Sequence, residues 1–144
     1  MKVDFWQLSR DPVEKVVALI AQRVLQGDER LLVVSDSGEQ REAISKTLWE
    51  TNPESFLANG EADEVGADRQ PILLAHTNEA ANGASHLVLA DGVWRDPQGF
   101  ERTFLLFGED TLEHARATWR ELDGRADCER AFFRQNGGKW SKVA

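Results

Sequence analysis

Residues 3–34 read VDFWQLSRDPVEKVVALIAQRVLQGDERLLVV, and this stretch decides the predicted fold. Apolar and polar side chains alternate over residues 3–8, which is the pattern of a β-strand. Valine and isoleucine then recur at helical spacing over residues 13–24, and Gly27 is a suitable residue to end that helix. Residues 31–34 form a continuous apolar run, as in a strand buried on both faces of a sheet. The order strand, helix, strand predicts parallel strands joined by a crossover helix.

Two segments have the form of a helix start. Asp11-Pro12-Val13-Glu14 predicts an N-cap at Asp11, with proline in the first helical position and glutamate reaching back as in a capping box. Ser37-Gly38-Glu39-Gln40 repeats this form and predicts a second helix that ends near Trp49. The inward stripe of that helix is formed by residues at helical spacing: Ala43, Ile44, Thr47 and Leu48.

The rest of the chain alternates short apolar runs with polar segments. Three further buried strands are predicted, at residues 72–75, 87–90 and 104–107. Residues 58–70 are rich in Gly, Ala, Asp and Glu and predict a solvated loop. A third helix is predicted from Asp110, with Glu113, to about Leu122. Residues 128–135, followed by Asn136-Gly137-Gly138, are compatible with a strand or a helix, and an edge strand with a turn is the preferred prediction.

No linker divides the chain, so we expect residues 1–144 to form one α/β domain. Its expected architecture has three layers, with helices on both faces of a mostly parallel, mixed sheet. This is a Rossmann-like arrangement. The turn at residues 35–39, however, holds one glycine and two acidic residues, and neither G-x-G-x-x-G nor G-x-x-x-x-G-K-[ST] occurs in the sequence. We therefore expect this domain to lack a nucleotide site.

The composition excludes several classes of protein. The formal net charge is −8 and the isoelectric point is near 4.9, which argues against a general nucleic-acid binder. Residues 1–110 carry ten basic and twenty acidic side chains, whereas residues 111–144 carry seven basic and five acidic ones. Cys128 is the only cysteine, so no disulfide within the chain is possible. Neither a signal peptide nor a membrane span is evident, and we expect a cytoplasmic protein.

No arrangement of residues resembles a catalytic site. The three histidines, His76, His86 and His114, lie in different segments without the spacing of a metal-binding helix. Ser35 and Asp36 could be combined with a histidine, but no G-x-S-x-G motif selects them. We therefore expect no catalytic residue, no metal and no cofactor.

The most informative cluster lies on the third predicted helix. Arg116, Trp119 and Arg120 are spaced i, i+3 and i+4, so they form one contiguous surface patch. Two arginines at this spacing repel each other by a few tenths of a kcal/mol, and an external anion would relieve the repulsion. In the other interpretation Trp119 belongs to the core, and the arginines are solvated or paired with Glu113 and Glu121.

A second cluster follows the second predicted helix. Leu48-Trp49 ends that helix, and Asn52-Pro53-Glu54-Ser55-Phe56-Leu57 follows it. Because proline forbids continuation of the helix, these aromatic residues could fold back as a small hydrophobic corner. Ordinary core filling is the alternative interpretation.

Taken together, these stretches resemble the chi subunit family of bacterial DNA polymerase III holoenzyme. The resemblance runs essentially end to end. It is carried by VDFWQL at residues 3–8, residues 30–34 through Leu48-Trp49, PESFL at 53–57, RQPILL at 69–74, ARATWR at 115–120 and GKW at 138–140.

The resemblance implies two binding surfaces. In the family the acidic C-terminal tail of the single-stranded-DNA-binding protein docks its terminal phenylalanine and carboxylate on a basic and aromatic patch, which corresponds here to Arg116, Trp119 and Arg120. Trp119 stands where tyrosine is common, and a further basic position falls on Leu112. The cationic surface is therefore expected either to be smaller than in the family or to be completed by C-terminal Arg and Lys residues.

The other surface implied by the resemblance binds the psi subunit or a helicase-like alternative partner. Its residues here are Trp49, Phe56 and Leu57, and Ala58-Asn59 replaces the Pro-His that often follows the phenylalanine.

The expected function is that of a non-catalytic accessory subunit of the DNA polymerase III clamp-loader complex. It would link the single-stranded-DNA-binding protein to the replisome and meet DNA only indirectly. The alternative is a small nucleotide-dependent α/β enzyme, and direct binding of single-stranded DNA is a third possibility that the net charge disfavours.

Overall fold

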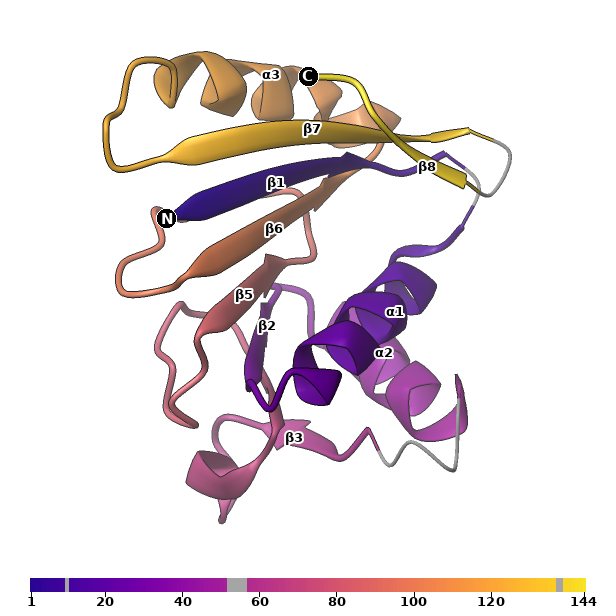
Figure 1. Cartoon of the computed structure of the whole chain (residues 1–144). Coiled ribbons are helices and arrows are strands. Elements are labelled where there is room, and N and C mark those ends of the chain that lie inside the picture. Colours follow the sequence, from indigo (N-terminus) through magenta and orange to yellow (C-terminus); the bar gives the residue numbers. More distant parts are fainter. Residues whose placement is uncertain (10, 52–56, 137–138) are drawn as a thin grey trace.

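The centre of the fold is one mixed sheet in a computed structural model that describes residues 1–9, 11–51, 57–136 and 139–144. Within these residues the sheet has eight strands in the order β3-β4-β2-β5-β6-β1-β7-β8 (Figure 1). Neighbouring strands are parallel except for β7 and β8, which are antiparallel. The strands are β1 (Lys2–Gln7), β2 (Leu31–Val34), β3 (Asn59–Glu61), β4 (Ile72–Ala75), β5 (His86–Leu89), β6 (Arg102–Phe107), β7 (Glu129–Asn136) and β8 (Lys139–Lys142).

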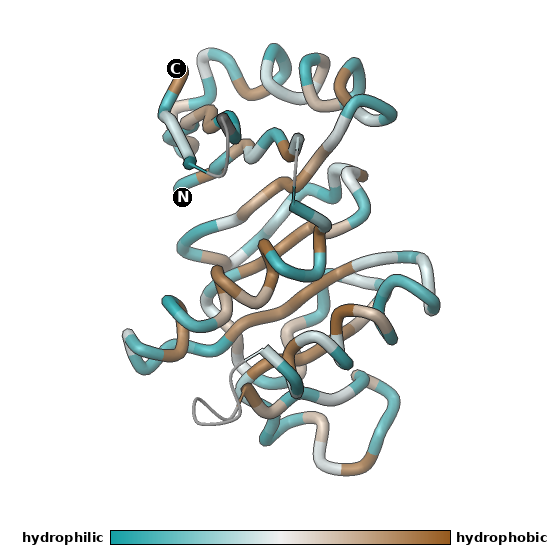
Figure 2. The backbone as a smooth tube through the Cα atoms, turned by 90° about the vertical axis from the view of Figure 1, so that its right-hand side faces the viewer, coloured by the Kyte–Doolittle hydropathy of each residue, from teal (hydrophilic) through white to brown (hydrophobic). Residues whose placement is uncertain are grey.

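Helices cover both faces of the sheet, so the predicted three-layer α/β fold is confirmed. Helices α1 (Val13–Gln26) and α2 (Gly38–Thr51) lie on one face, and α3 (Leu112–Glu121) lies on the other (Figure 1). In Figure 2, α1 and α2 face the viewer, and brown hydrophobic stretches of the sheet run behind them. Two short 3₁₀ turns, Ala67–Arg69 and Glu109–Thr111, precede β4 and α3.

Strand β2 shows why the centre of this sheet tolerates only apolar residues. All four of its side chains are fully buried. Leu31 and Val33 point into the core under α1 and α2, whereas Leu32 and Val34 point into the core on the α3 side. Successive strand residues face opposite sides, so a strand between two helical layers must be apolar throughout. The predicted buried strand at residues 31–34 is confirmed.

The two predicted helix starts differ in outcome. Ser37 Oγ accepts a hydrogen bond from the Gln40 N–H at 3.1 Å, as expected of a cap. The predicted N-cap at Asp11 is wrong, because Pro12 occupies that position without a side-chain cap. The Asp11 carboxylate instead accepts a hydrogen bond from Nε2 of Gln135 at 2.8 Å, and the Asp11 N–H donates to Oε1 of the same side chain. A buried partner on β7 has replaced the local cap.

Helix α2 buries a narrower stripe than predicted. Ile44 and Leu48 are buried as expected, but Thr47 is only half-buried. The prediction for Ala43 is wrong, because this residue is exposed. Helix α2 packs beside α1 near the end of the sheet that carries β3 and β4, so only one side of it meets the core.

Residues 58–70 are more ordered than the predicted loop. Residues 59–61 form β3, which pairs in parallel with β4, so the loop prediction is wrong there. The side chain of the buried Asn59 is hydrogen-bonded, since its amide donates to the Leu57 carbonyl at 3.0 Å and accepts from Ser45 Oγ at 2.5 Å. Buried polar groups are tolerated when they are hydrogen-bonded in this way.

The C-terminal segment forms a strand as predicted, but not an edge strand. Strand β7 lies between β1 and β8, and Phe132 and Phe133 pack on opposite faces of it. Strand β8 is the edge. The predicted turn falls partly on residues 137–138, which lie outside the described residues. Asp110 was predicted to begin α3 and instead lies in the 3₁₀ turn before it.

Among the described residues, no helix is both long enough and apolar enough to cross a bilayer. Cys128 is half-buried against the core on the α3 side, and burial raises the pKa of its thiol. This is the behaviour of a small apolar residue, since reactive cysteines have a lowered pKa.

Candidate functional site

Helix α3 turns a narrow apolar side to the sheet. Ala115 and Thr118 are its buried residues, and the Thr118 hydroxyl donates to the His114 carbonyl at 3.1 Å. Leu122 follows the helix and is also buried. Because the buried stripe consists of small side chains, the larger residues beside it lie at the boundary between core and solvent.

Trp119 is the aromatic residue at this boundary. Its ring is half-buried and packs edge-to-face against Phe5, with ring centroids 5.2 Å apart, and against Phe132, at 5.7 Å. Such aromatic pairs contribute about 0.5–1.5 kcal/mol each beyond the area they bury. The interpretation of Trp119 as a core residue is therefore right for one side of the ring, while the rest of the ring faces the surface.

Arg130 completes this arrangement from β7. Its guanidinium carbon lies 4.1 Å from the centroid of the Trp119 ring, which is a cation–π contact. One guanidinium nitrogen donates to the Trp119 carbonyl, and the other pairs with Asp123 at 2.9 Å. Of the two expectations for this patch, a smaller surface or completion by C-terminal basic residues, the position of Arg130 agrees with the second. Nothing in the sequence shows which residue of β7 lies over Trp119, because that depends on how β7 pairs with β1.

Arg116 and Arg120 both lie exposed on the outer side of α3. Arg116 pairs with Glu113 at 3.0 Å, and the two side chains are 55% and 81% exposed. A pair this exposed contributes at most about 1 kcal/mol, so an incoming anion can compete for Arg116. Arg120 has no ion pair with any residue that the structure describes. The three predicted residues therefore lie together on α3, and Arg130 joins them from β7. We call these four residues the α3 surface.

The second predicted cluster is only partly at the surface. Trp49 is 53% exposed near the end of α2, which is unusual for so large an apolar side chain. Leu57 is 2% exposed and belongs to the core under α1 and α2, so its side chain does not lie beside Trp49 at the surface. Phe56 lies outside the described residues.

The turn between β2 and α2 is where a Rossmann-like protein would bind phosphate. Here the Asp36 N–H donates to the Asp91 carboxylate at 3.0 Å, and Asp91 also pairs with Arg95 at 2.7 Å. Burial tends to raise the pKa of Asp91, but the hydrogen bonds from Arg95 and the Asp36 backbone outweigh it and lower that pKa. A carboxylate already occupies the amide that a phosphate would use, so the turn offers no support for a nucleotide-dependent enzyme.

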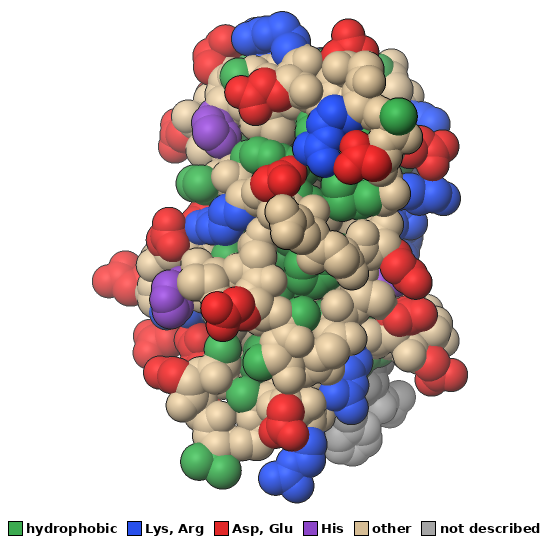
Figure 3. Space-filling view, turned by 90° about the vertical axis from the view of Figure 1, so that its left-hand side faces the viewer, with side chains coloured by type: hydrophobic (Ala, Val, Ile, Leu, Met, Phe, Trp, Pro, Cys, Tyr) green, Lys and Arg blue, Asp and Glu red, His purple; other side chains and the backbone are tan. Residues whose placement is uncertain are grey.

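Charge is interspersed over the face of the molecule shown in Figure 3. Lys and Arg side chains lie there among more numerous Asp and Glu side chains and form no continuous band. Affinity for a nucleic acid comes mainly from clustered cations, so this face is unsuited to DNA.

Among the described residues, one group has the chemistry of metal ligands: Glu29, His86 and Glu101. It lies at the start of β5 and β6 and not on the α3 surface.

The family model for the DNA polymerase III chi subunit, HolC, matches residues 1–127. The chain belongs to this family. Membership in the chi family assigns the chain to a subunit of DNA polymerase III and therefore to DNA replication. No curated protein matches the chain. The matched range includes α3 and ends before β7, so Arg116, Trp119 and Arg120 lie inside it and Arg130 lies beyond it.

Proposed function

We propose that this chi-family chain is a non-catalytic accessory subunit of the clamp-loader complex that binds the acidic C-terminal tail of the single-stranded-DNA-binding protein. The α3 surface carries the proposal. It combines two exposed arginines with a half-buried tryptophan. The tail would be held by Arg116, Trp119 and Arg120, and the chain would link that protein to the replisome without binding DNA itself.

The chemistry of the α3 surface suits a short acidic peptide with an aromatic end. A guanidinium bonded to a carboxylate contributes roughly 1.5–3 kcal/mol when partly desolvated. Burial of a phenylalanine ring beside Trp119 adds about 1.5–3 kcal/mol. Ordering a flexible tail costs part of this free energy, which leaves a Kd on the order of micromolar. The affinity should fall as salt is added, because the arginines are exposed.

The test uses fluorescence anisotropy of a labelled acidic peptide that ends in Asp-Ile-Pro-Phe. We expect the R116A/R120A variant to bind at least about tenfold more weakly than the wild-type chain. The matched control is R23A/R69A, which removes the same charge from exposed positions on α1 and in the turn before β4. The proposal is wrong if the wild type does not bind the peptide, or if R116A/R120A binds it as tightly as the control does.

We propose that the second surface, around Trp49 and Phe56, binds a partner subunit, either psi or a helicase-like alternative. The support is the exposure of Trp49, since an apolar side chain of this size exposed on a helix is typical of an interface anchor. Leu57 would support the surface from the core. Gel filtration of the chain mixed with purified psi subunit tests the assignment. W49A should abolish co-elution, whereas V65A, at the fully exposed Val65, should leave it intact.

A further inference from the structure

Three side chains with metal-ligand chemistry meet at the end of the sheet where β5 and β6 begin. Glu29 precedes β2, His86 is the first residue of β5, and Glu101 immediately precedes β6. These strands are neighbours in register, because Leu31 pairs with His86 and His86 pairs with Arg102. The backbone holds the group in place, since the Glu101 N–H donates to the Ser85 carbonyl at 2.8 Å.

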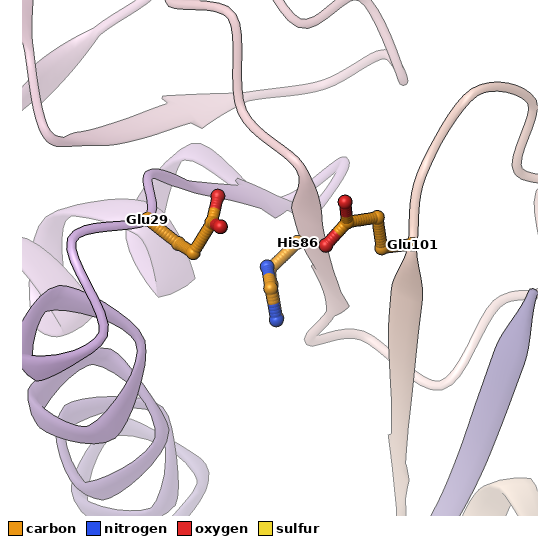
Figure 4. A group of neighbouring side chains, drawn as sticks. All are labelled: Glu29, His86 and Glu101. Atoms are coloured by element: carbon orange, nitrogen blue, oxygen red, sulfur yellow. The ribbon is translucent and has the colours of Figure 1, made fainter.

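The geometry is close to that of a metal site. The ligand atoms of the three side chains all lie within 4.8 Å of one another. In Figure 4, His86 lies between the two carboxylates, which approach from either side of it. Zinc binds imidazole nitrogen and carboxylate oxygen at about 2.0–2.2 Å, so its ligand atoms lie roughly 3.4 Å apart in a tetrahedral site. Binding of the ion would require the three ligand atoms to approach one another from their present spacing.

Charge at this position favours a cation. Glu29 and Glu101 have no ion pair with any Lys or Arg in the described part of the chain. The basic residues next to them are already engaged. Arg102 pairs with the buried Asp4, and Arg30 donates to the carbonyls of Asp68 and Asn82. Two carboxylates held together without a counter-charge repel each other, and a divalent ion between them would remove that repulsion.

Ser85 provides the supporting contacts that metal ligands have. Its hydroxyl donates to Glu29 Oε2 at 2.5 Å, and the hydroxyl oxygen of Ser85 lies 2.8 Å from Nδ1 of His86. A residue that hydrogen-bonds both ligands orients them toward one point, as second-layer partners do in metal sites.

We propose that Glu29, His86 and Glu101 bind one divalent transition-metal ion of the zinc class. Imidazole as a ligand selects this class over magnesium and calcium, which prefer oxygen alone. Three protein ligands leave a fourth position for water. The bound ion would join the loop before β2 to the starts of β5 and β6.

Isothermal titration of the full chain with Zn²⁺, after treatment with a chelator, tests the proposal. The wild type should bind one ion per chain with an affinity on the order of micromolar. H86N and the E29Q/E101Q variant should each bind at least about tenfold more weakly.

Two controls address other zinc ligands on the chain. H76N removes an exposed histidine outside the group, and C128S removes the only thiol, so both should bind zinc like the wild type. Affinity for the acidic peptide, measured as above, should be unchanged in H86N if that variant is folded. The proposal is overturned if no saturable binding occurs, if H86N and E29Q/E101Q bind zinc normally, or if C128S or H76N abolishes binding.

Discussion

The two faces of the sheet are covered in different ways, and the difference separates stability from recognition. On one face, α1 buries six of its fourteen residues, all of them aliphatic. On the other face, α3 buries two of its ten, Ala115 and Thr118. Helix α1 closes its part of this face to solvent by its own packing, whereas Trp49 of α2 on the same face stays exposed. The α3 face leaves a tryptophan and three arginines at its boundary, so it has side chains to offer a partner.

The largest change in the free energy of unfolding should come from a substitution on the aliphatic face. I20A removes a side chain that is 2% exposed between α1 and the sheet. A cavity at such a position lowers the free energy of unfolding by about 2–5 kcal/mol. Urea denaturation measures this loss, and V65A, at an exposed site, should change it by less than about 0.5 kcal/mol. If the folded I20A protein also lost affinity for the acidic peptide, stability and recognition would not be separated as we argue.

The next largest change in the free energy of unfolding should come from Trp119, which contributes both to stability and to the proposed peptide site. W119A removes the edge-to-face contacts with Phe5 and Phe132 together with the surface for Arg130. Because the ring is only half-buried, we expect a loss of about 2 kcal/mol in the free energy of unfolding. Peptide affinity should fall at least about tenfold in the same variant. W119F should recover part of the stability, and full peptide affinity in W119A would contradict the proposed site.

The parts of this molecule that sequence could predict are those decided by neighbours along the chain. The apolar run of β2 required burial on both faces, and Ser37 capped α2 because the N–H it accepts from lies three residues ahead. Prediction from the local sequence pattern was wrong where a side chain forms its hydrogen bond with a residue far away in the chain. Asp11 looked like a cap, yet its partner, Gln135, is 124 residues away.

The candidate site also contains residues that local sequence could place and a residue that it could not. The spacing of Arg116, Trp119 and Arg120 follows from the geometry of one helix, so sequence was enough to place them together. Arg130 lies over Trp119 only because β7 pairs with β1 and crosses beneath α3, and no periodicity in the sequence encodes that pairing. In the second cluster, Leu57 fills the core, as the alternative interpretation has it, whereas Trp49 is exposed.

A smaller, pH-dependent effect is expected from the ion pair at the end of β5. The lowered pKa of Asp91 means that its charged form stabilises the folded chain. This stability is present above the pKa of the unfolded residue, about 3.9, and is lost as pH falls through the lower folded value. D91N should therefore destabilise the chain at pH 7, and the difference from wild type should shrink in acid. Urea denaturation at several pH values measures the difference in the free energy of unfolding between D91N and the wild type. If this difference grew as the pH fell, the charged form of Asp91 would not be the stabilising one.

The smallest effect on stability should come from the Glu113–Arg116 pair on the α3 face, where both partners are exposed. E113Q should change the free energy of unfolding by less than about 1 kcal/mol, because solvent screens such pairs. It should still strengthen binding of the acidic peptide by about twofold, since it frees Arg116 and removes a negative charge that repels the tail. Anisotropy at low salt measures the gain, which should vanish at high salt. E121Q, at the exposed Glu121 of the same helix, alters the net charge equally without freeing Arg116, so an equal gain in both variants would indicate general repulsion instead of competition for Arg116.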